Sequence, residues 1–349
     1  MEITEKKYIE IIKENKELQN KVSDSTFNIS VLSNITLNKL KDILEYPLRK
    51  NNINAKVTFG NYDNILQDSM NQDNSEVIII HQELWNLSSN LFKSHLISDL
   101  EEAKKFSNEL ISQIDIILEN LKSKKLIIYN SFSAKNFTSE LKQKTIFNLI
   151  ANDLNKHLEE SLLKYNNLRV CDIDQITFNL GVQSSLDFRS YNAFRDLYKT
   201  NWLQSYVSTI QHYIYSMSGK IKKALIVDCD NTLWGGVLGE DGFDNIEMSN
   251  NSKKGEIFKY VQNVINQLSK KGILICLCSK NNPEDVDEVI QSHPEFVLSD
   301  ENLTLKKVNW KDKSGNIKQI AEDLNIGLDS LIFIDDSDFE INLIRESLP

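Results

Sequence analysis

The stretch "ALIVDCDNTLWGG", residues 224–236, decides how the second half of the chain folds. Its first four residues are apolar and predict a buried strand. Two carboxylates, Asp228 and Asp230, follow on either side of Cys229. Ligands bind at the carboxyl ends of strands in an open parallel sheet, so these residues stand where a catalytic site is expected. Because side chains alternate along extended backbone, Asp228 and Asp230 share one face and Cys229 points to the other.

Strand and helix patterns alternate on both sides of this stretch. The predicted strands are residues 27–34, 55–60, 75–82, 124–132 and 168–174 in the first half and 224–230, 273–280, 296–300 and 330–336 in the second. Helices are predicted between them, for example over residues 97–122 and 142–165. Gly219 and the run "KIKK" mark a boundary. We therefore expect an α/β fold of two doubly wound, Rossmann-like domains, residues 1–220 and 221–349. The passage 183–220 is rich in aromatic residues, and its stretch "DFRSYNAFRDLYKTNW", residues 187–202, is expected to pack between the two domains.

Composition excludes several classes of protein. The net charge of −10 argues against a nucleic-acid-binding face, which needs a basic surface. Apolar runs such as "SEVIIIH" are far shorter than the roughly 20 residues that span a bilayer, so no membrane association is expected. The charged start has no apolar signal segment, which predicts a cytoplasmic protein. The cysteines are too few for a disulfide framework and are expected to be reduced: Cys171, Cys229, Cys276 and Cys278.

Polar groups at other strand ends add to the first two acids. Three acids from separate strand ends can bind Mg²⁺, a hard cation that prefers oxygen ligands. The expected metal ligands are Asp228, Asp230, Asp335 and Asp336. A carboxylate such as Asp228 can also act as a nucleophile and form an aspartyl phosphate, while Asp230 moves the proton to and from the leaving group. The expected phosphate-binding residues are Thr232, Ser279 and Lys313.

Four segments in this order, "DCDNT", "CSKN", "DKSGNI" and "FIDDSDFE", resemble the motifs of the haloacid dehalogenase (HAD) superfamily. The extension "DNTLWGGVLGEDG" is similar to the FkbH-like branch. The resemblance implies a Mg²⁺-dependent enzyme that converts 1,3-bisphosphoglycerate to a glyceryl thioester on an acyl carrier protein, with loss of phosphate. It also implies that Cys229 holds the glyceryl group covalently, whereas strand alternation makes Cys229 a core residue. The alternatives are a HAD phosphatase acting on a small phosphate ester and a non-catalytic scaffold protein.

Spacing between the motifs leaves no room for a cap domain, so a capless HAD fold with an open site is expected. An open site suits a carrier-borne substrate. The basic segment "LKKVNWKDK", Leu305 to Lys313, is either a solvated loop or a docking surface for an acidic carrier protein. FkbH-like proteins commonly continue into a domain resembling an acetyltransferase. This chain ends soon after the fourth motif, as expected of a short family member or of a truncated product.

The first half is similar to the N-terminal region of FkbH-like proteins, which resembles an SGNH-hydrolase fold. Ser33 stands at a strand end, where such a hydrolase keeps its nucleophile. The histidines of this half, His81, His95, His157 and His212, form no sequence pattern that would complete a catalytic set. A binding or scaffolding role is therefore favoured for this half. Arg189 and Arg195 are candidate phosphate ligands.

Overall fold

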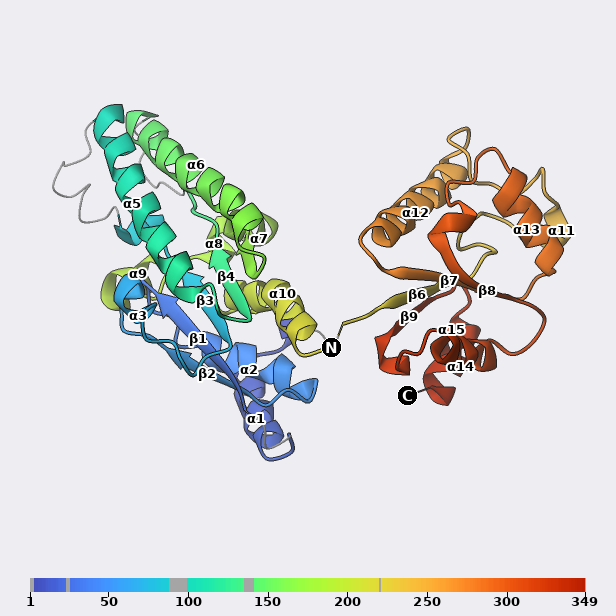
Figure 1. Cartoon of the computed structure of the whole chain (residues 1–349), viewed down its shortest axis with the longest axis horizontal. Helices are drawn as coiled ribbons and strands as arrows, with labels where there is room; N and C mark the ends of the chain where they lie inside the picture. The colour runs from blue at the N-terminus through green and yellow to red at the C-terminus, as the bar shows by residue number, and fades with distance from the viewer. Residues whose placement is uncertain (1–2, 23–25, 88–98, 135–140, 220, 349) are drawn as a thin grey trace. The chain divides into compact units, whose positions relative to one another are not determined.

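The computed structural model describes residues 3–22, 26–87, 99–134, 141–219 and 221–348. The chain divides into two compact units, Met1–Gly219 and Lys220–Pro349. Each unit is built around one parallel sheet, of five strands in unit 1 and four in unit 2 (Figure 1). The predicted α/β class with two parallel sheets is therefore confirmed. None of the helices in these residue ranges is long and apolar enough to cross a membrane.

The sheet of unit 1 has the strand order β2-β1-β3-β4-β5, with every pair parallel. Its strands are β1 (Phe27–Ser33), β2 (Ala55–Phe59), β3 (Val77–His81), β4 (Leu126–Asn130) and β5 (Leu168–Cys171). The continuous apolar run of β3 is buried on both faces, as is typical of a central parallel strand. Val77 and Ile79 join one apolar cluster and Ile78 and Ile80 join the other, so the sheet separates two cores.

The helices of unit 1 cover both faces of its sheet (Figure 1). They are η1 (Ile3–Glu5), α1 (Tyr8–Gln19), α2 (Leu40–Lys50), α3 (Ile65–Asp68), α5 (Leu100–Leu121), α6 (Leu141–Lys164), α7 (Ile173–Leu180), α8 (Val182–Ser185), α9 (Phe188–Phe194) and α10 (Thr200–Met217). The helix predicted from Ile97 begins at Leu100, where Asp99 caps it by accepting hydrogen bonds from two backbone N–H groups. Residues 97 and 98 lie outside the described part of the chain.

Part of the aromatic-rich passage belongs to a core of unit 1. Trp202 is fully buried and stacks between Tyr198 and Tyr206, with ring centroids 3.5 and 5.3 Å away. All three rings belong to the apolar cluster of unit 1. Trp202 and Tyr206 lie four residues apart in α10 and so share one side of that helix, and Tyr198 lies two residues before the helix begins.

Unit 2 has the strand order β8-β7-β6-β9, again all parallel. Its strands are β6 (Ala224–Val227), β7 (Leu274–Ser279), β8 (Leu303–Val308) and β9 (Leu331–Ile334). Its helices are α11 (Leu238–Asp241), α12 (Lys253–Lys270), α13 (Pro283–Ser292), η2 (Asp300–Asn302), α14 (Lys313–Asp323), η3 (Leu328–Ser330) and α15 (Asp338–Ser347). Along β7, Ile275 and Leu277 enter one apolar cluster, and Cys276 and Cys278 enter the other. The two cysteines are therefore core residues.

One predicted strand of unit 2 is wrong. Residues 296–299 form no strand, and the edge strand β8 lies further along, at Leu303–Val308. β8 carries Lys306 and Lys307, so it lacks the continuous apolar run that marks the buried strands. "FVLSD" looks strand-like because Leu298, 2% exposed, packs into the core from a loop. Sequence periodicity cannot separate these two cases.

The connections within unit 2 are short. α11 and α12 lie between β6 and β7, and α13 with η2 lies between β7 and β8. Within residues 221–348, all of which the structure describes, neither connection contains a further domain. The carboxyl edge of this sheet therefore carries no cap.

Candidate active site

Three segments bring ionisable side chains to the carboxyl edge of the unit 2 sheet. Asp228 follows β6, Asp335 follows β9, and Lys313 is the first residue of α14. The Lys313 Nζ atom lies 2.9 Å from Asp228 Oδ1 and 2.6 Å from Asp335 Oδ2. All three side chains are buried, with exposed fractions of 4, 5 and 7% for Lys313, Asp228 and Asp335. One ammonium group thus bridges two buried carboxylates.

The start of α14 determines where Lys313 points. Asp312 caps this helix, because its side chain accepts a hydrogen bond from the backbone N–H of Gly315 at 3.0 Å. The cap fixes the first turn, and Lys313 in that turn extends toward Asp228. The sequence alone left open a solvated lysine at this helix start, and the burial of Lys313 excludes that placement.

The charges at this edge do not balance. Burial disfavours the charged form of Lys313, but the Asp228 and Asp335 carboxylates outweigh it and hold its pKa above the ordinary value. Burial raises the pKa of Asp228 despite the opposing effect of Lys313. Partial burial and then the charge of Asp335 raise the pKa of Asp336. Three carboxylates, those of Asp228, Asp335 and Asp336, thus cluster beside one ammonium group.

Three of the acids could hold a metal ion together. One carboxylate oxygen each from Asp228, Asp335 and Asp336 can be chosen so that all lie within 4.8 Å of one another. Asp336 is exposed, so this cluster is open to solvent on one side. Oxygen ligands of this kind suit a hard divalent cation, and such an ion would supply the missing positive charge.

Asp230 lies outside this cluster. The sequence predicts it as one of four metal ligands. Its Oδ1 atom accepts hydrogen bonds from the Trp234 indole at 2.9 Å and from the Leu238 backbone N–H at 3.0 Å. Its Oδ2 atom accepts a hydrogen bond from Asn281 Nδ2 at 2.9 Å. Three donors therefore fix the orientation of this carboxylate. Trp234 acts here as a donor to the site as well as a core aromatic.

Two hydroxyl groups lie in this region. The Ser279 side chain is 2% exposed and its Oγ atom accepts a hydrogen bond from Asn281 Nδ2 at 3.1 Å. The Thr232 Oγ1 atom is buried and has no hydrogen-bond partner. A buried hydroxyl without a partner is uncommon in folded proteins and fits a site that binds a polar ligand. The sequence assigned no role to Asn281, which here links Ser279 to Asp230.

Cys229 lies in the core. Its side chain is 0% exposed and belongs to the same apolar cluster as Leu225 and Val227. Burial raises the pKa of the Cys229 thiol well above its usual range, with a smaller opposing effect from a hydrogen bond to Ser279. The thiolate is the nucleophilic form of cysteine, so this environment disfavours reactivity. Strand alternation predicts this orientation from sequence.

The basic segment before Lys313 is largely neutralised by unit 2 itself. Lys306 forms ion pairs with Asp287 at 2.6 Å and Asp300 at 2.8 Å, and Lys307 pairs with Asp323 at 2.7 Å. These lysines hold the edge strand β8 to its neighbours. This pairing weakens the interpretation of the segment as a docking surface for an acidic carrier protein.

The candidate residues of unit 1 that the structure describes do not form a hydrolase site. Ser33 Oγ accepts a hydrogen bond from the backbone N–H of Ile35, and no histidine in the described residues hydrogen-bonds to it. His81 is fully buried among aromatic rings, and His157 pairs with Asp115 at 2.9 Å. His95 lies outside the described residues.

The two arginines proposed as phosphate ligands lie elsewhere on unit 1. Arg189 is exposed in α9. The Arg195 guanidinium lies over the Tyr191 ring, 5.2 Å from its centroid. Among the described residues, neither arginine forms a hydrogen bond or an ion pair with Ser33.

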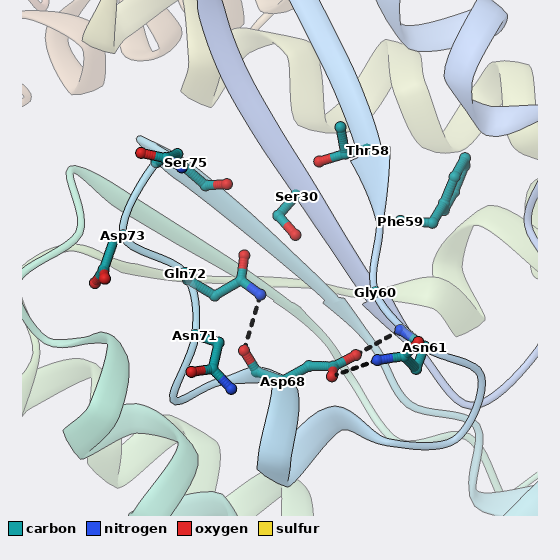
Figure 2. Close-up of a pocket in the computed structure, with 11 residues that line it drawn as sticks. Ser30, Thr58, Phe59, Gly60, Asn61, Asp68, Asn71, Gln72, Asp73 and Ser75 are labelled. Atoms are coloured by element: carbon teal, nitrogen blue, oxygen red, sulfur yellow. Dashed lines mark hydrogen bonds between the residues drawn. The ribbon is translucent and has the colours of Figure 1, made fainter.

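A separate polar pocket lies in unit 1, between the β1–β2 edge of the sheet and the loop before β3 (Figure 2). Asp68 organises its floor: the carboxylate accepts hydrogen bonds from the backbone N–H and side-chain amide of Asn61, at 2.5 and 3.0 Å. Its backbone carbonyl accepts one from Gln72 at 2.8 Å. A Cβ at Gly60 would lie 2.5 Å from Asp68 Oδ2, so this approach requires glycine. These contacts account for the Asp68 carboxylate as a structural group.

The fold and the site of unit 2 together define an α/β protein with an acidic, lysine-bridged centre at the carboxyl edge of a parallel sheet. The crystal structure of the N-terminal part of the protein BF1531 from Bacteroides fragilis, which contains a phosphatase domain complexed with Mg, is similar to this chain. The TM-score is 0.83 and the identity 25%, over 99% of this chain and 92% of that one. Apo D-lactate dehydrogenase from Escherichia coli aligns over 92% of each chain, with 11% identity and a TM-score of 0.20. No protein-family model and no curated protein sequence matches the chain.

Proposed function

We propose that unit 2 is a Mg²⁺-dependent phosphatase domain of the HAD type, with Asp228 as its nucleophile and a small phosphate ester as its substrate. The observation that carries this proposal is the buried Lys313 ammonium between Asp228 and Asp335, with Asp336 beside them. The similarity to a phosphatase domain complexed with Mg supports it. The order of the four sequence motifs supports the HAD type.

Asp228, Asp335 and Asp336 are the proposed metal ligands, because they present the clustered carboxylate oxygens that Mg²⁺ prefers. When bound, Mg²⁺ would neutralise charge on the phosphoryl group and orient it. Asp230 is assigned to proton transfer instead, because donors from Trp234, Leu238 and Asn281 hold its carboxylate in place.

The proposed reaction has two steps. The Asp228 carboxylate attacks phosphorus and forms an aspartyl phosphate, while the bond to the alcohol oxygen breaks and Asp230 gives that oxygen a proton. Water then attacks the aspartyl phosphate, Asp230 takes a proton from the water, and inorganic phosphate leaves. Lys313 neutralises the phosphoryl oxygens, and the Ser279 and Thr232 hydroxyls donate hydrogen bonds to them.

Removal of divalent cations is expected to abolish phosphate release, and Mg²⁺ is expected to restore it. A saturating ligand also stabilises the folded state, by about 2.7 kcal/mol at a hundred times its dissociation constant, so Mg²⁺ should raise the melting temperature. Phosphate release and thermal unfolding with EDTA and with added Mg²⁺ measure both effects. Asp336→Asn should lose the Mg²⁺-dependent rise, whereas Asp244→Asn, an exposed acid elsewhere in unit 2, should keep it. Full activity in EDTA would contradict the metal assignment.

The second candidate is the FkbH-like reaction, in which 1,3-bisphosphoglycerate gives a glyceryl thioester on an acyl carrier protein with loss of phosphate. One observation favours it. The site has no cap, which gives a carrier-borne arm access. Unit 1 would then serve as a binding or scaffolding domain. A non-catalytic scaffold is the alternative of another class.

Cys229→Ala separates the first two candidates. We expect the variant to release phosphate from simple esters at a rate within about twofold of the native rate, because a buried thiol with a raised pKa is a packing group. Rates with a simple ester, and intact masses after incubation with 1,3-bisphosphoglycerate and a holo acyl carrier protein, provide the measurement. A glyceryl adduct on the native chain that is absent from Cys229→Ala would favour the loading reaction.

A further inference from the structure

Trp310 is a large aromatic side chain left in solvent beside the candidate active site. It is 70% exposed, whereas Trp202 and Trp234 are 0% exposed. It lies between the end of β8 at Val308 and Lys313, on the segment that leads into the site. An isolated exposed apolar residue is common on protein surfaces. Trp310 is distinguished by the contacts of its indole and by its position in the chain.

The indole is held in one orientation. Its Nε1 atom donates a hydrogen bond to Asn282 Oδ1 at 3.0 Å. Asn282 is held in turn, because its Nδ2 atom donates to Asp285 Oδ2 at 3.0 Å. An exposed side chain with one fixed donor contact loses rotational freedom without gaining core burial. Such a side chain is well suited to be a preformed contact surface, since the entropy of ordering it is already lost before a ligand binds.

The backbone around Trp310 is also anchored to the site. The Asn309 N–H donates to the carbonyl of Ser279 at 3.0 Å. The Asn309 side-chain oxygen accepts hydrogen bonds from the Lys311 N–H at 2.9 Å and from Asn316 Nδ2 at 3.0 Å. The segment is therefore fixed to the strand end that carries one of the proposed phosphate-binding hydroxyls.

The partner of the indole is adjacent to the catalytic groups. Asn282 follows Asn281, whose side chain contacts both Asp230 and Ser279. Trp310 is thus linked to the residue proposed to protonate the leaving group, through Asn282 and Asn281. The organic part of a phosphate ester leaves from the side of that acid. Within residues 221–348 no inserted domain covers this edge of the sheet, so the exposed indole is an apolar surface on the side of the proposed acid.

We propose that Trp310 is a specificity-determining platform on which the organic group of the substrate stacks, and that the substrate is a phosphate ester bearing a flat, aryl or heteroaryl group. This inference rests on the proposed phosphatase function. The exposed indole face supplies the stacking surface, and the hydrogen bond to Asn282 keeps that face beside the leaving-group oxygen. Lys313 and the Ser279 and Thr232 hydroxyls bind the phosphoryl group, so they contribute equally to the binding of every ester.

The test compares benzyl phosphate with ethyl phosphate, two alkyl esters that differ in the aromatic ring. Trp310→Ala is expected to lower kcat/KM for benzyl phosphate about tenfold, the scale of one aromatic stacking contact, and to leave the value for ethyl phosphate within about twofold. Trp310→Phe should keep most of the preference for benzyl phosphate. Tyr260→Ala removes an aromatic side chain of similar exposure, 69%, from α12 and should change neither value.

The outcomes distinguish this inference from the function on which it rests. Equal losses for both esters, or no loss for either, would overturn the platform and leave the phosphatase function standing. If the native protein releases phosphate from neither ester, the phosphatase function fails. A binding measurement then tests the role of Trp310 as a platform. Benzyl phosphonate should quench tryptophan fluorescence in the native chain but not in Trp310→Phe, and equal quenching in both would overturn the platform.

Discussion

Replacing Asp228 with asparagine is expected to lower Mg²⁺-dependent phosphate release by about 10⁴-fold or more, the scale on which removal of a nucleophile reduces turnover. An amide cannot form the aspartyl phosphate, and it offers the metal a neutral oxygen in place of a charged one. Burial already raises the pKa of Asp228, so the ionised carboxylate is costly in the folded state. The isosteric, uncharged amide should therefore leave the protein folded.

Phosphate release with a simple ester measures the loss, and thermal unfolding checks the fold. The native protein, quenched in acid during turnover, should carry one phosphoryl group by intact mass, and Asp228→Asn should carry none. Asp244→Asn is the matched control, since Asp244 is an exposed acid outside the site. Native-like turnover by Asp228→Asn would exclude Asp228 as nucleophile. Normal metal binding with no turnover in the native protein would favour the scaffold alternative.

Replacing Lys313 with methionine is expected to abolish turnover and to lower the free energy of unfolding by about 3 kcal/mol at neutral pH. Removing one partner from a buried ion pair leaves an uncompensated charge, and that costs about 3–5 kcal/mol. Here two buried acids, Asp228 and Asp335, lose the same cation. We use the lower figure because Asp228 can take up a proton. Urea unfolding without Mg²⁺ measures the change.

The effect of Lys313→Met depends on pH with a definite sign. The pKa of Asp228 is already raised in the native protein, and loss of the ammonium raises it further. A raised pKa means that the folded state binds the proton more tightly than the unfolded state, so stability is gained as pH falls through that pKa. The destabilisation should therefore shrink at acidic pH. Lys313 itself has a raised pKa, so in the native protein its contribution is complete at neutral pH and is lost only in strong alkali.

Two further variants test the Lys313 result. Lys311→Met, which removes an exposed charge from the same segment, should leave stability and turnover near native values. Lys313→Arg keeps the positive charge, so it should recover part of the stability, but the larger guanidinium should not restore turnover. A Lys313→Met variant as stable as the native protein at neutral pH would contradict the bridged arrangement of these acids.

Much of the fold follows from local patterns. Continuous apolar runs such as "VIIIH" predict central parallel strands because both faces of such a strand are buried. The same rule fails at β8, where two lysines of an edge strand form ion pairs with acids of other segments. It also fails for "FVLSD", whose apolar residues pack from a loop. Period and hydropathy report burial, and burial does not require strand pairing.

The sequence by itself determined which residue types stand at the carboxyl ends of the second sheet: Asp228 and Asp230, Ser279, Lys313, and Asp335 with Asp336. It did so because strand ends and helix starts are local features of the chain. Only the tertiary structure decided which of them meet. Lys313 joins Asp228 and Asp335, while Asp230 turns to Trp234 and Asn281. Apart from Trp234, which is four residues from Asp230, these partners are distant in sequence. Their distances depend on strand order and register, which bring separate segments together. The exposure of Trp310 has the same origin, because a side chain is exposed only when no distant segment covers it.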